Sequence, residues 1–401
     1  MNKLTVRDVD VSGQRVLVRV DFNVPLDERT GVITDDGRIQ AALPTIRYLI
    51  EKGARVILAS HLGRPDGKVD EKLRMTAVAQ RLSQILGRPV KAARDCIGAE
   101  VEESVASLKN GDVVMLENLR FHTAEEENDP IFAQGLAKLA DIFVDDAFGT
   151  AHRSHASIVG VAKHLPAVAG LLLEKELTML GDILDKPSHP FAALLGGAKI
   201  SDKVTMVENI MGKVDCILVG GGMAATFLKA RNLEVGLSLI EGEMLETATD
   251  LMEKATGSGI RLLLPDDVLV ANEISAEATF KVVPVDKIPT DMRVADIGSQ
   301  TVKSFSEELR GCKTIFWNGP MGVYEIPIFA EGTIDLAKLL AGSQATTVIG
   351  GGSTAEVVAD MGLTDKMTFV STGGGASLRF LGGKSLPGVD ALLDKESPAG
   401  S

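Results

Sequence analysis

Four segments in the second half of the chain place glycines between an apolar run and a helix-like sequence. They read LLGGAKISDK (194–203), LVGGGMAATF (218–227), IGGGSTAEVV (349–358) and VSTGGGASLR (370–379). Where side chains are missing, backbone N–H groups and the positive end of a helix can approach phosphate oxygens. The recurrence of this junction therefore predicts a site that binds phosphates, of the kind that nucleotides occupy.

Polar side chains accompany two of these turns. Lys199 and Lys203 are four residues apart, so both would lie on one face of a helix. Like charges at that spacing destabilise a helix slightly unless an anion lies between them, so the pair favours a bound anion over two solvated side chains. Ser353 and Thr354 directly follow glycines, and they fit either contact with a ligand or capping of the next helix.

A different set of residues follows the apolar runs of the first half. In open parallel sheets, ligands bind beyond the carboxyl ends of the strands, and polar residues collect there. The set comprises Asp21 and Asn23 of RVDFNVP, Arg38 after TDDG, His61 and Arg64 of SHLGRP, Arg120 of ENLRFH and Arg153 of GTAHRSHAS. Arginine binds carboxylate and phosphate with two parallel hydrogen bonds. The set predicts a site for a small polyanion, although any single arginine could instead form a surface ion pair.

The elements that position these residues alternate between strands and helices. Buried strands are predicted within 16–22, 54–60, 112–118 and 141–147, and again within six apolar runs between 191 and 375. Such alternation predicts two α/β domains, each a doubly wound (Rossmann-like) parallel sheet, joined by a helix and separated by a cleft. We expect an N-terminal domain over 1–170, a connecting helix or hinge over 171–190, a C-terminal domain over 191–385 and a tail over 386–401 that ends in a loose SPAGS.

Composition excludes several classes of protein. A chain of 401 residues is long for one core, and 45% hydrophobic with 24% charged residues is ordinary for a globular protein. The net charge of −13 disfavours broad nucleic-acid binding. We expect a cytoplasmic protein without a membrane partner, because the start lacks a secretory signal and no apolar run suits a membrane span. Cys96, Cys216 and Cys312 are far apart in sequence, without a CxxC pair, which suggests three buried thiols and no structural zinc site.

Two further interpretations need to be weighed. GGGMAA (220–225) and GGGSTA (350–355) satisfy the loose G-x-G-x-x-A pattern of dinucleotide-binding proteins, which would suggest a nucleotide-dependent oxidoreductase. Neither is followed by an acidic residue at the expected strand end, so the pattern is incomplete. A protein that binds a nucleotide without catalysis is the second alternative. A basic anion site in one domain and a nucleotide-like site in the other instead favour phosphoryl transfer across a cleft.

The motifs together resemble one family. RVDFNVP, SHLGRP, LENLRFH, DDAFGTAHRSHAS, LLGGAKISDK, VGGGMAATFLK, FWNGPMGVYE and STGGGAS occur in the order and form typical of phosphoglycerate kinases, and the match runs from about residue 4 to residue 392. The resemblance implies a glycolytic enzyme that transfers a phosphoryl group reversibly from 1,3-bisphosphoglycerate to ADP, giving 3-phosphoglycerate and ATP. It also implies a monomer that uses Mg²⁺.

The resemblance assigns the candidate residues to two sites. It places 3-phosphoglycerate on the first-half set: Asp21, Asn23, Arg38, His61, Arg64, Arg120 and Arg153. It places the nucleotide on a second-half set: Gly197, Ala198, Lys203, Gly222, Asn318, Pro320, Glu325, Gly351, Gly352, Ser353 and Thr354, with Gly373, Gly374 and Gly375 near the phosphates.

Catalysis in such a site needs no general base. The carboxylate that attacks ATP in the reverse direction is already ionised at neutral pH. Arg38, Lys203 and Lys199 are the expected catalytic residues, because cations around the moving phosphoryl group stabilise its charge. The family usually has Asp where this chain has Ser353, and that Asp contacts the magnesium–phosphate assembly, so the metal ligands of this chain stay unassigned.

Overall fold

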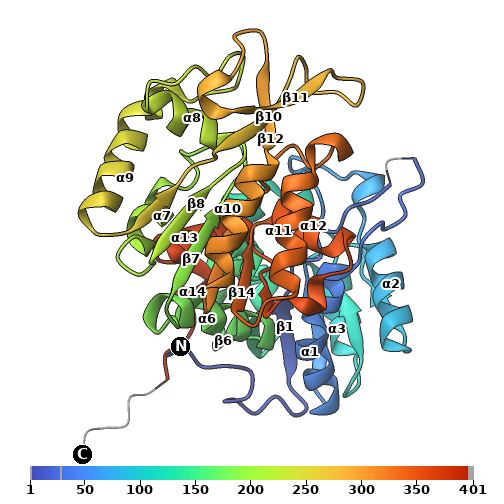
Figure 1. The fold of residues 1–401 in the computed structure, drawn as a ribbon. Helices are drawn as coiled ribbons and strands as arrows, with labels where there is room; N and C mark the ends of the chain where they lie inside the picture. The colour runs from blue at the N-terminus through green and yellow to red at the C-terminus, as the bar shows by residue number, and fades with distance from the viewer. Residues whose placement is uncertain (1, 28, 396–401) are drawn as a thin grey trace, which may run out of the picture. The chain divides into compact units, whose positions relative to one another are not determined.

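The computed structural model describes residues 2–27 and 29–395, which form two compact units (Figure 1). Unit 1 is the described part of Met1–Thr178 together with that of Ser385–Ser401, and unit 2 is Met179–Lys384. The division falls within helix α6 (Leu171–Asp185), in the segment expected to connect two domains. Within the described residues, every helix is too short or too polar to span a membrane.

Unit 1 is built on a six-stranded, wholly parallel sheet with the order β3-β4-β2-β1-β5-β6. Its strands are β1 (Arg15–Arg19), β2 (Arg55–Ala59), β3 (Val90–Ala92), β4 (Val113–Met115), β5 (Ile142–Asp145) and β6 (Ala167–Ala169). The chain leaves β1 toward β2 on one side and later returns to β5 on the other. The point at which the strand order reverses is where such sheets bind ligands.

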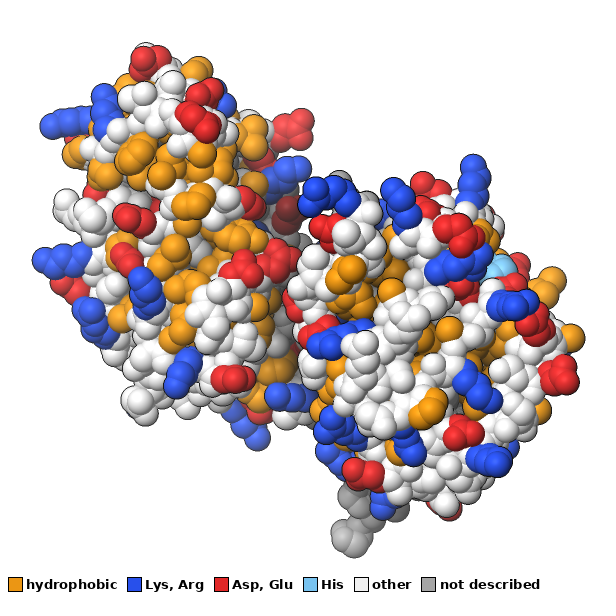
Figure 2. Space-filling view, turned by 90° about the vertical axis from the view of Figure 1, so that its right-hand side faces the viewer, with side chains coloured by type: hydrophobic (Ala, Val, Ile, Leu, Met, Phe, Trp, Pro, Cys, Tyr) orange, Lys and Arg blue, Asp and Glu red, His pale blue; other side chains and the backbone are white. Residues whose placement is uncertain are grey.

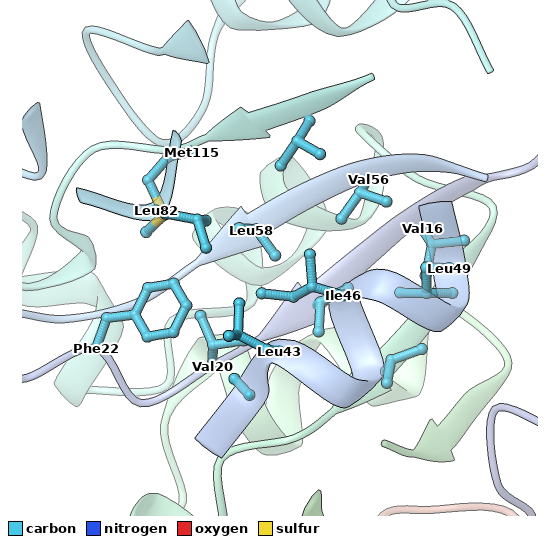
Figure 3. Close-up of a cluster of buried hydrophobic side chains, with 14 of the residues drawn as sticks. Val16, Val20, Phe22, Leu43, Ile46, Leu49, Val56, Leu58, Leu82 and Met115 are labelled. Carbon is cyan, nitrogen blue, oxygen red and sulfur yellow. The ribbon is translucent and has the colours of Figure 1, made fainter. Parts of the chain in front are cut away.

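One face of this sheet packs against α1 (Gly37–Glu51) and α2 (Thr76–Leu86), as Figure 3 shows. Leu43, Ile46 and Leu49 form the buried stripe of α1 and meet Val16 and Val56 of the sheet. Their three-residue spacing places these apolar side chains on one face of the helix. The other α-helices of five or more residues before α6 are α3 (Ala99–Ala106) and α5 (Pro130–Ala137).

The end of the chain packs on unit 1. After α14 (Pro387–Asp390), Leu393 donates its N–H to Ala167 O at 2.9 Å and accepts from Leu4 N–H at 2.8 Å. The segment thereby extends the edge at β6 and buries Leu392, whereas Leu393 stays exposed. The closing SPAGS lies outside the described residues.

Unit 2 contains a second six-stranded parallel sheet, with the order β15-β14-β13-β7-β8-β9. The strands are β7 (Phe191–Leu195), β8 (Cys216–Val219), β9 (Arg261–Leu263), β13 (Thr314–Asn318), β14 (Thr346–Gly350) and β15 (Phe369–Val370). Its helices are α7 (Val204–Ile210), α8 (Met223–Ala230), α9 (Leu245–Gly257), α10 (Ser299–Arg310), α11 (Glu331–Ala341), α12 (Gly352–Asp360) and α13 (Gly374–Leu381). Here the strand order reverses between β7 and β13.

Unit 2 also carries a three-stranded antiparallel sheet that the sequence analysis did not anticipate. It is formed by β10 (Asp267–Ala271), β11 (Phe280–Pro284) and β12 (Arg293–Ile297) in the order β11-β10-β12. The edge strand β11 is mostly exposed and lacks a buried apolar run, whereas β10 is fully buried and was also missed. The face of the molecule in Figure 2 shows acidic and basic side chains interspersed with apolar ones, without a broad area of one charge.

Candidate functional site

The first-half candidates meet at the carboxyl edge of the sheet of unit 1. Arg19 at the end of β1 pairs in register with Ala59 at the end of β2, so the segments that follow both strands run side by side. Leu119 N–H donates to Ser60 O at 3.1 Å, which brings the segment after β4 to the same place. Parallel pairing thus gathers residues that are far apart in the sequence.

Asp21 and Arg38 form an ion pair at this edge. Arg38, in the first turn of α1, donates from Nη1 to Asp21 Oδ2. Burial opposes ionisation of Asp21, but the charges of Arg38 and Arg19 outweigh it and hold the pKa of this carboxyl below its ordinary value. The Arg38 side chain remains 38% exposed, which leaves guanidinium N–H groups available for a ligand.

His61 is a buried, neutral imidazole. Burial lowers the pKa of His61 well below its ordinary value, and the nearby Arg19 and Arg120 lower it further while Asp21 opposes them. Arg19 Nη2 lies 3.3 Å from His61 Nδ1. Because a guanidinium only donates hydrogen bonds, Nδ1 must accept, and the imidazole proton resides on Nε2. His61 can therefore donate a hydrogen bond from Nε2 without adding a charge.

The loop that carries His61 and Arg64 is held from two sides. Asn23 Oδ1 accepts from Gly63 N–H at 2.8 Å, and Arg120 Nη1 donates to Gly63 O at 2.9 Å. Arg120 is buried and also pairs with Glu126 at 3.1 Å, and burial lowers its pKa. Arg64 on this loop is exposed, and Arg153 is half-buried after the short turn that follows β5. Asn23 and Arg120 are thus held in place, whereas Arg64 and Arg153 reach solvent.

Sequence reasoning missed a layer of buried polar residues beneath this edge. Arg19 is 1% exposed and donates from Nε to Ser157 Oγ at 2.9 Å. Glu125 accepts from the N–H and the hydroxyl of Ser157 at 2.9 and 2.6 Å, and lies 3.7 Å from His155 Nδ1. These contacts place Arg19 where it adds to the positive charge around His61. A charged residue inside the apolar run VLVRV was the available signal.

The second-half candidates meet where β7 and β13 lie side by side. Gly196 N–H donates to Asn318 O at 2.9 Å, and Gly197 N–H donates to Pro320 O at 2.8 Å. Gly222 precedes α8, and the next residue donates its N–H to Gly197 O at 3.0 Å. The loops after β7, β8 and β13 therefore form one surface made mainly of backbone, on which Ala198 is exposed.

Lys203 is buried against this surface, whereas Lys199 is not. The Lys203 ammonium lies 3.2 Å from the point that a Cβ on Gly197 would occupy, and burial lowers its pKa while Asp202 and Glu241 oppose that change. The prediction that both lysines share a helix face is wrong, because α7 begins at Val204 and residues 196–203 form bends and turns. Glu241 holds this irregular segment by accepting from Ile200 N–H at 2.6 Å, and Lys199 is exposed on it.

Two helices begin at the same point beyond β14. Gly351, with φ +96°, precedes α12, and Gly374 opens α13. A Cβ on Gly374 would come within 3.0 Å of both Gly351 Cα and Gly352 N, so only glycine permits this approach. Gly373 and Gly375 flank it at the start of α13. The free N–H groups of both helix ends thus converge on one small region.

Neither Ser353 nor Thr354 caps helix α12, although a helix cap was one of the two predicted roles for this pair. Gly351 occupies the cap position of α12, and no side chain caps that end. Thr354 is buried, and its hydroxyl accepts from Gly319 N–H at 2.7 Å, which ties α12 to the loop after β13. Ser353 lies in the first turn of α12 and is exposed. The cap interpretation is therefore wrong for both residues.

Asn318 supplies a buried donor at this edge. It is 3% exposed, and its Nδ2 lacks a hydrogen-bond partner among the described residues. The same nitrogen would lie 2.9 Å from a Cβ on Gly351, so the amide points at the glycine turn. An orphaned buried donor needs an explanation, and a ligand acceptor would provide one. Glu325, the last of the second-half candidates, is exposed on the segment that follows.

The two edges define a class of protein: an α/β protein with an arginine-rich edge on one parallel sheet and a backbone-lined edge on another. The family profile described as "Phosphoglycerate kinase" matches residues 6–384. Curated phosphoglycerate kinases of Dictyoglomus turgidum and Pelotomaculum thermopropionicum are 54% identical over 393 residues and 55% identical over 395 residues, and each match covers 98% of this chain and 98% or 100% of the relative.

Solved structures give the same result. The phosphoglycerate kinase of Coxiella burnetii is 41% identical, with a TM-score of 0.85, over 97% of this chain and 98% of that one. That of Pyrococcus horikoshii is 33% identical, with the same TM-score of 0.85 and the same coverage. The chain belongs to the phosphoglycerate kinase family.

Proposed function

We propose that the carboxyl edge of unit 1 binds 3-phosphoglycerate and that the edge of unit 2 binds the nucleotide. The enzyme transfers a phosphoryl group reversibly between 1,3-bisphosphoglycerate and ADP, which is the reaction of its family. The observation that carries the assignment of the two edges is their difference in chemistry. One is lined with cationic side chains, and the other is lined with backbone N–H groups.

At unit 1, the substrate carries a carboxylate and a phosphate, and both suit the arginines. Arg64 and Arg153 reach solvent and are free to move onto a phosphate, whereas Arg120 is fixed by Gly63 and Glu126. His61 donates from Nε2, and Asp21 and Asn23 accept from or position the hydroxyl-bearing part of the substrate. The negative charge of Asp21 also reduces the repulsion between the arginines when no substrate is bound.

At unit 2, the nucleotide phosphates lie over the starts of α12 and α13, where helix N–H groups converge. The Asn318 Nδ2 donor and the Lys203 ammonium flank that region. Gly197, Ala198, Gly222, Pro320 and Glu325 would line the rest of the nucleotide. The lowered pKa of Lys203 reflects burial without a carboxylate in direct contact, and a phosphate would supply the missing counter-charge.

The residues at the unit 2 edge fit a metal that arrives with the nucleotide. Within the described part of the chain, the two groups of three or more His, Cys, Asp and Glu side chains that could hold a metal ion lie elsewhere. Ser353 offers only a hydroxyl. Because Mg²⁺ keeps several waters and often binds through substrate phosphates, Mg²⁺–ATP or Mg²⁺–ADP remains compatible with this edge. When bound, Mg²⁺ would neutralise phosphate charge.

The chain supplies alignment and positive charge for the transfer. The attacking carboxylate of 3-phosphoglycerate is ionised at neutral pH, so no residue needs to remove a proton. Arg38 from unit 1 and Lys203 from unit 2, with Lys199 as a third cation, stabilise the charge of the moving phosphoryl group. The exposed position of Lys199 on an irregular segment lets it reach the phosphates without refolding a helix.

Transfer requires that the two substrates meet away from water, and we expect the units to close when both are bound, with α6 as the hinge. Small-angle X-ray scattering should give a smaller radius of gyration with both substrates than with either alone. An unchanged radius at saturation would count against closure. We expect a cytoplasmic monomer, which light scattering and cell fractionation would check.

The reaction itself is tested by following ADP formation from ATP, Mg²⁺ and 3-phosphoglycerate. ADP should appear only when all three are present, and omission of 3-phosphoglycerate controls for hydrolysis. A correctly folded protein that binds ATP without turnover would indicate the non-catalytic alternative. Oxidation or reduction of a nicotinamide nucleotide would indicate the oxidoreductase alternative.

A further inference from the structure

Two cysteines that are distant in the sequence come together in unit 2. Cys216 is the first residue of β8, Cys312 lies two residues before β13, and Glu308 lies in the last turn of α10. Their two sulfur atoms and a carboxylate oxygen all lie within 4.8 Å of one another. All three thiols are free and buried, as expected, but the sequence did not reveal that these two lie together, because the parallel sheet brings the starts of its strands to one edge.

The surroundings of the pair are unusual for buried thiols. Cys216 is fully buried, and Cys312 is 8% exposed. Arg261 holds Glu308 with two hydrogen bonds, from Nη1 to Oε2 at 2.6 Å and from Nη2 to Oε1 at 2.5 Å. The nearby Asp215 is occupied by His189 Nδ1 at 2.7 Å and by Phe191 N–H at 2.6 Å. A fixed carboxylate thus stands beside two sulfur atoms.

The thiol of Cys312 is held beside the end of α10. It donates to the backbone O of Glu308 at 3.5 Å. A cation that binds both sulfurs would displace the thiol protons, because the thiolate is the form that ligates metals.

We propose that Cys216, Cys312 and Glu308 bind a thiophilic divalent cation of the Zn²⁺ class. Two thiolates and one carboxylate carry three negative charges, which the cation and the guanidinium of Arg261 together balance. Three protein ligands suffice for such a cation when water completes the coordination. Mg²⁺ and Ca²⁺ prefer oxygen ligands and would be poor competitors. Water can approach through a cavity of about 390 Å³ whose lining includes Cys312.

A second group of three ligating residues in unit 1 is less suited to this cation. Asp95, Cys96 and His122 also lie within 4.8 Å of one another. However, Cys96 is the one sulfur in this group, and its thiol already donates to Glu117 O at 3.0 Å. Asp95 and His122 already pair at 2.6 Å. This group therefore offers one sulfur ligand, whereas the group in unit 2 offers two.

The location separates this cation from the phosphoryl transfer. Cys216 and Cys312 stand at the amino ends of their strands, whereas the proposed nucleotide contacts Gly222 and Asn318 stand at or beyond the carboxyl ends. The cation would link β8, α10 and the start of β13. Binding should therefore raise the thermal stability of unit 2, and the reaction should not depend on it.

The test uses Cd²⁺ as a spectroscopic probe for Zn²⁺. Titration of the whole reduced protein should give a sulfur-to-cadmium charge-transfer band that saturates at one equivalent, and excess Zn²⁺ should remove it. Cys216→Ala and Cys312→Ala should each lose most of the band, and Glu308→Gln should weaken affinity by about tenfold or more. Cys96→Ala is the matched control and should keep the band.

Alkylation provides a second measurement that does not depend on the variants folding. One equivalent of Zn²⁺ should protect Cys312 of the unmodified protein from iodoacetamide, with the labelled sites read by mass spectrometry. A band that persists in Cys216→Ala and disappears in Cys96→Ala would assign the cation to Asp95, Cys96 and His122 instead. Absence of any band, with unprotected Cys312, would overturn the proposal.

Discussion

The two parallel sheets present different chemistry at the edges that we propose as anion sites. In unit 1 the carboxyl edge is made of charged side chains, among them Arg38, Arg120 and the buried Arg19, with Asp21 as a counter-charge. In unit 2 the edge is made of close backbone turns and the starts of α12 and α13, with Lys203 as the buried cation. The same kind of sheet thus carries one edge built from charged side chains and one built from closely approaching backbone.

The difference predicts how each site responds to change. A side chain that supplies charge can be removed without disturbing the backbone, so substitutions in unit 1 should alter chemistry and leave the fold intact. A backbone site has no side chain to remove, and it fails when a side chain is added.

Arg38→Ala should lower kcat by at least about a hundredfold, the effect of losing one donor to the charge of a transition state. The KM for 3-phosphoglycerate should change much less, because Arg64, Arg120 and Arg153 remain. Arg47→Ala, an exposed residue on the same helix α1, is the matched control and should leave kcat unchanged. A rise in KM alone would make Arg38 a residue of ground-state binding.

The stability contributed by carboxylates in the two units should also depend differently on pH. Burial raises the pKa of Asp296 in unit 2 to about 7, and the nearby Glu331 and Asp335 add to the rise, while hydrogen bonds from the N–H groups of Gly332 and Ile297 oppose it. The native state then binds more protons than the unfolded state between about pH 4 and 7, so stability falls as pH rises through that range. In unit 1, hydrogen bonds from Arg15 lower the pKa of Asp141.

Asp296→Asn should therefore gain stability relative to the unmodified protein as pH rises from 5 to 8, by roughly 2 kcal/mol. Asp141→Asn is the control of opposite sign. The stabilisation that ionised Asp141 contributes is present above the pKa of the unfolded state and is lost only as pH falls below that value. The effect of Asp141→Asn should therefore be constant from pH 5 to 8. Urea unfolding at several pH values measures both. Equal pH profiles for the two variants would contradict the pKa assignments.

Gly374→Ala tests the backbone site. The added Cβ would lie 3.0 Å from Gly351 Cα and from Gly352 N, so the starts of α12 and α13 must separate. Overpacking of this kind typically costs about 1–3 kcal/mol, and we expect an approximately tenfold weaker affinity for ADP. Gly257→Ala at the end of α9, which meets no atom within 4 Å, is the control. Calorimetric titration with ADP should show no change for Gly257→Ala.

Much of the charged edge could be predicted from the sequence. Apolar runs located β1, β2, β4 and β5, and the residues that follow them are the ones that the parallel register gathers. Arg19 was missed because periodicity identifies the face of a strand but not what lies on the helices against it. Its partner Ser157 lies in a π-helical turn (Ala156–Gly160) and Glu125 lies in the short helix α4 (Thr123–Glu126), and only the folded chain brings both near Arg19.

The backbone edge was harder to predict in detail. Glycine-rich turns showed where phosphates could bind, but a four-residue spacing placed Lys199 and Lys203 on a helix that begins only at Val204. Local pattern could not reveal that Glu241, from a distant segment, holds residues 200 and 201 out of a helix. For the same reason, the approach of Gly374 to Gly351 is a tertiary contact without a signature in either segment.

The smallest expected effect concerns Ser353, where the family resemblance implies Asp. Ser353 is exposed in the first turn of α12, and it does not cap that helix. A carboxylate there would add one negative charge near the Mg²⁺–phosphate complex, and would also repel the phosphates themselves. An exposed charge–charge interaction is of order 1 kcal/mol, so these opposed effects should leave a change of about fivefold or less.

Ser353→Asp should therefore lower the Mg²⁺ concentration that gives half the maximal rate, without changing the reaction catalysed. Ser353→Ala separates charge from hydrogen bonding, because it removes the hydroxyl and adds no charge. If the hydroxyl contacts a phosphate or a metal-bound water, Ser353→Ala should raise the Mg²⁺ requirement by a small factor. Superimposable Mg²⁺ titrations for all three proteins would show that residue 353 affects Mg²⁺ binding neither through charge nor through a hydrogen bond. The backbone at the start of α12 would then define this part of the site alone.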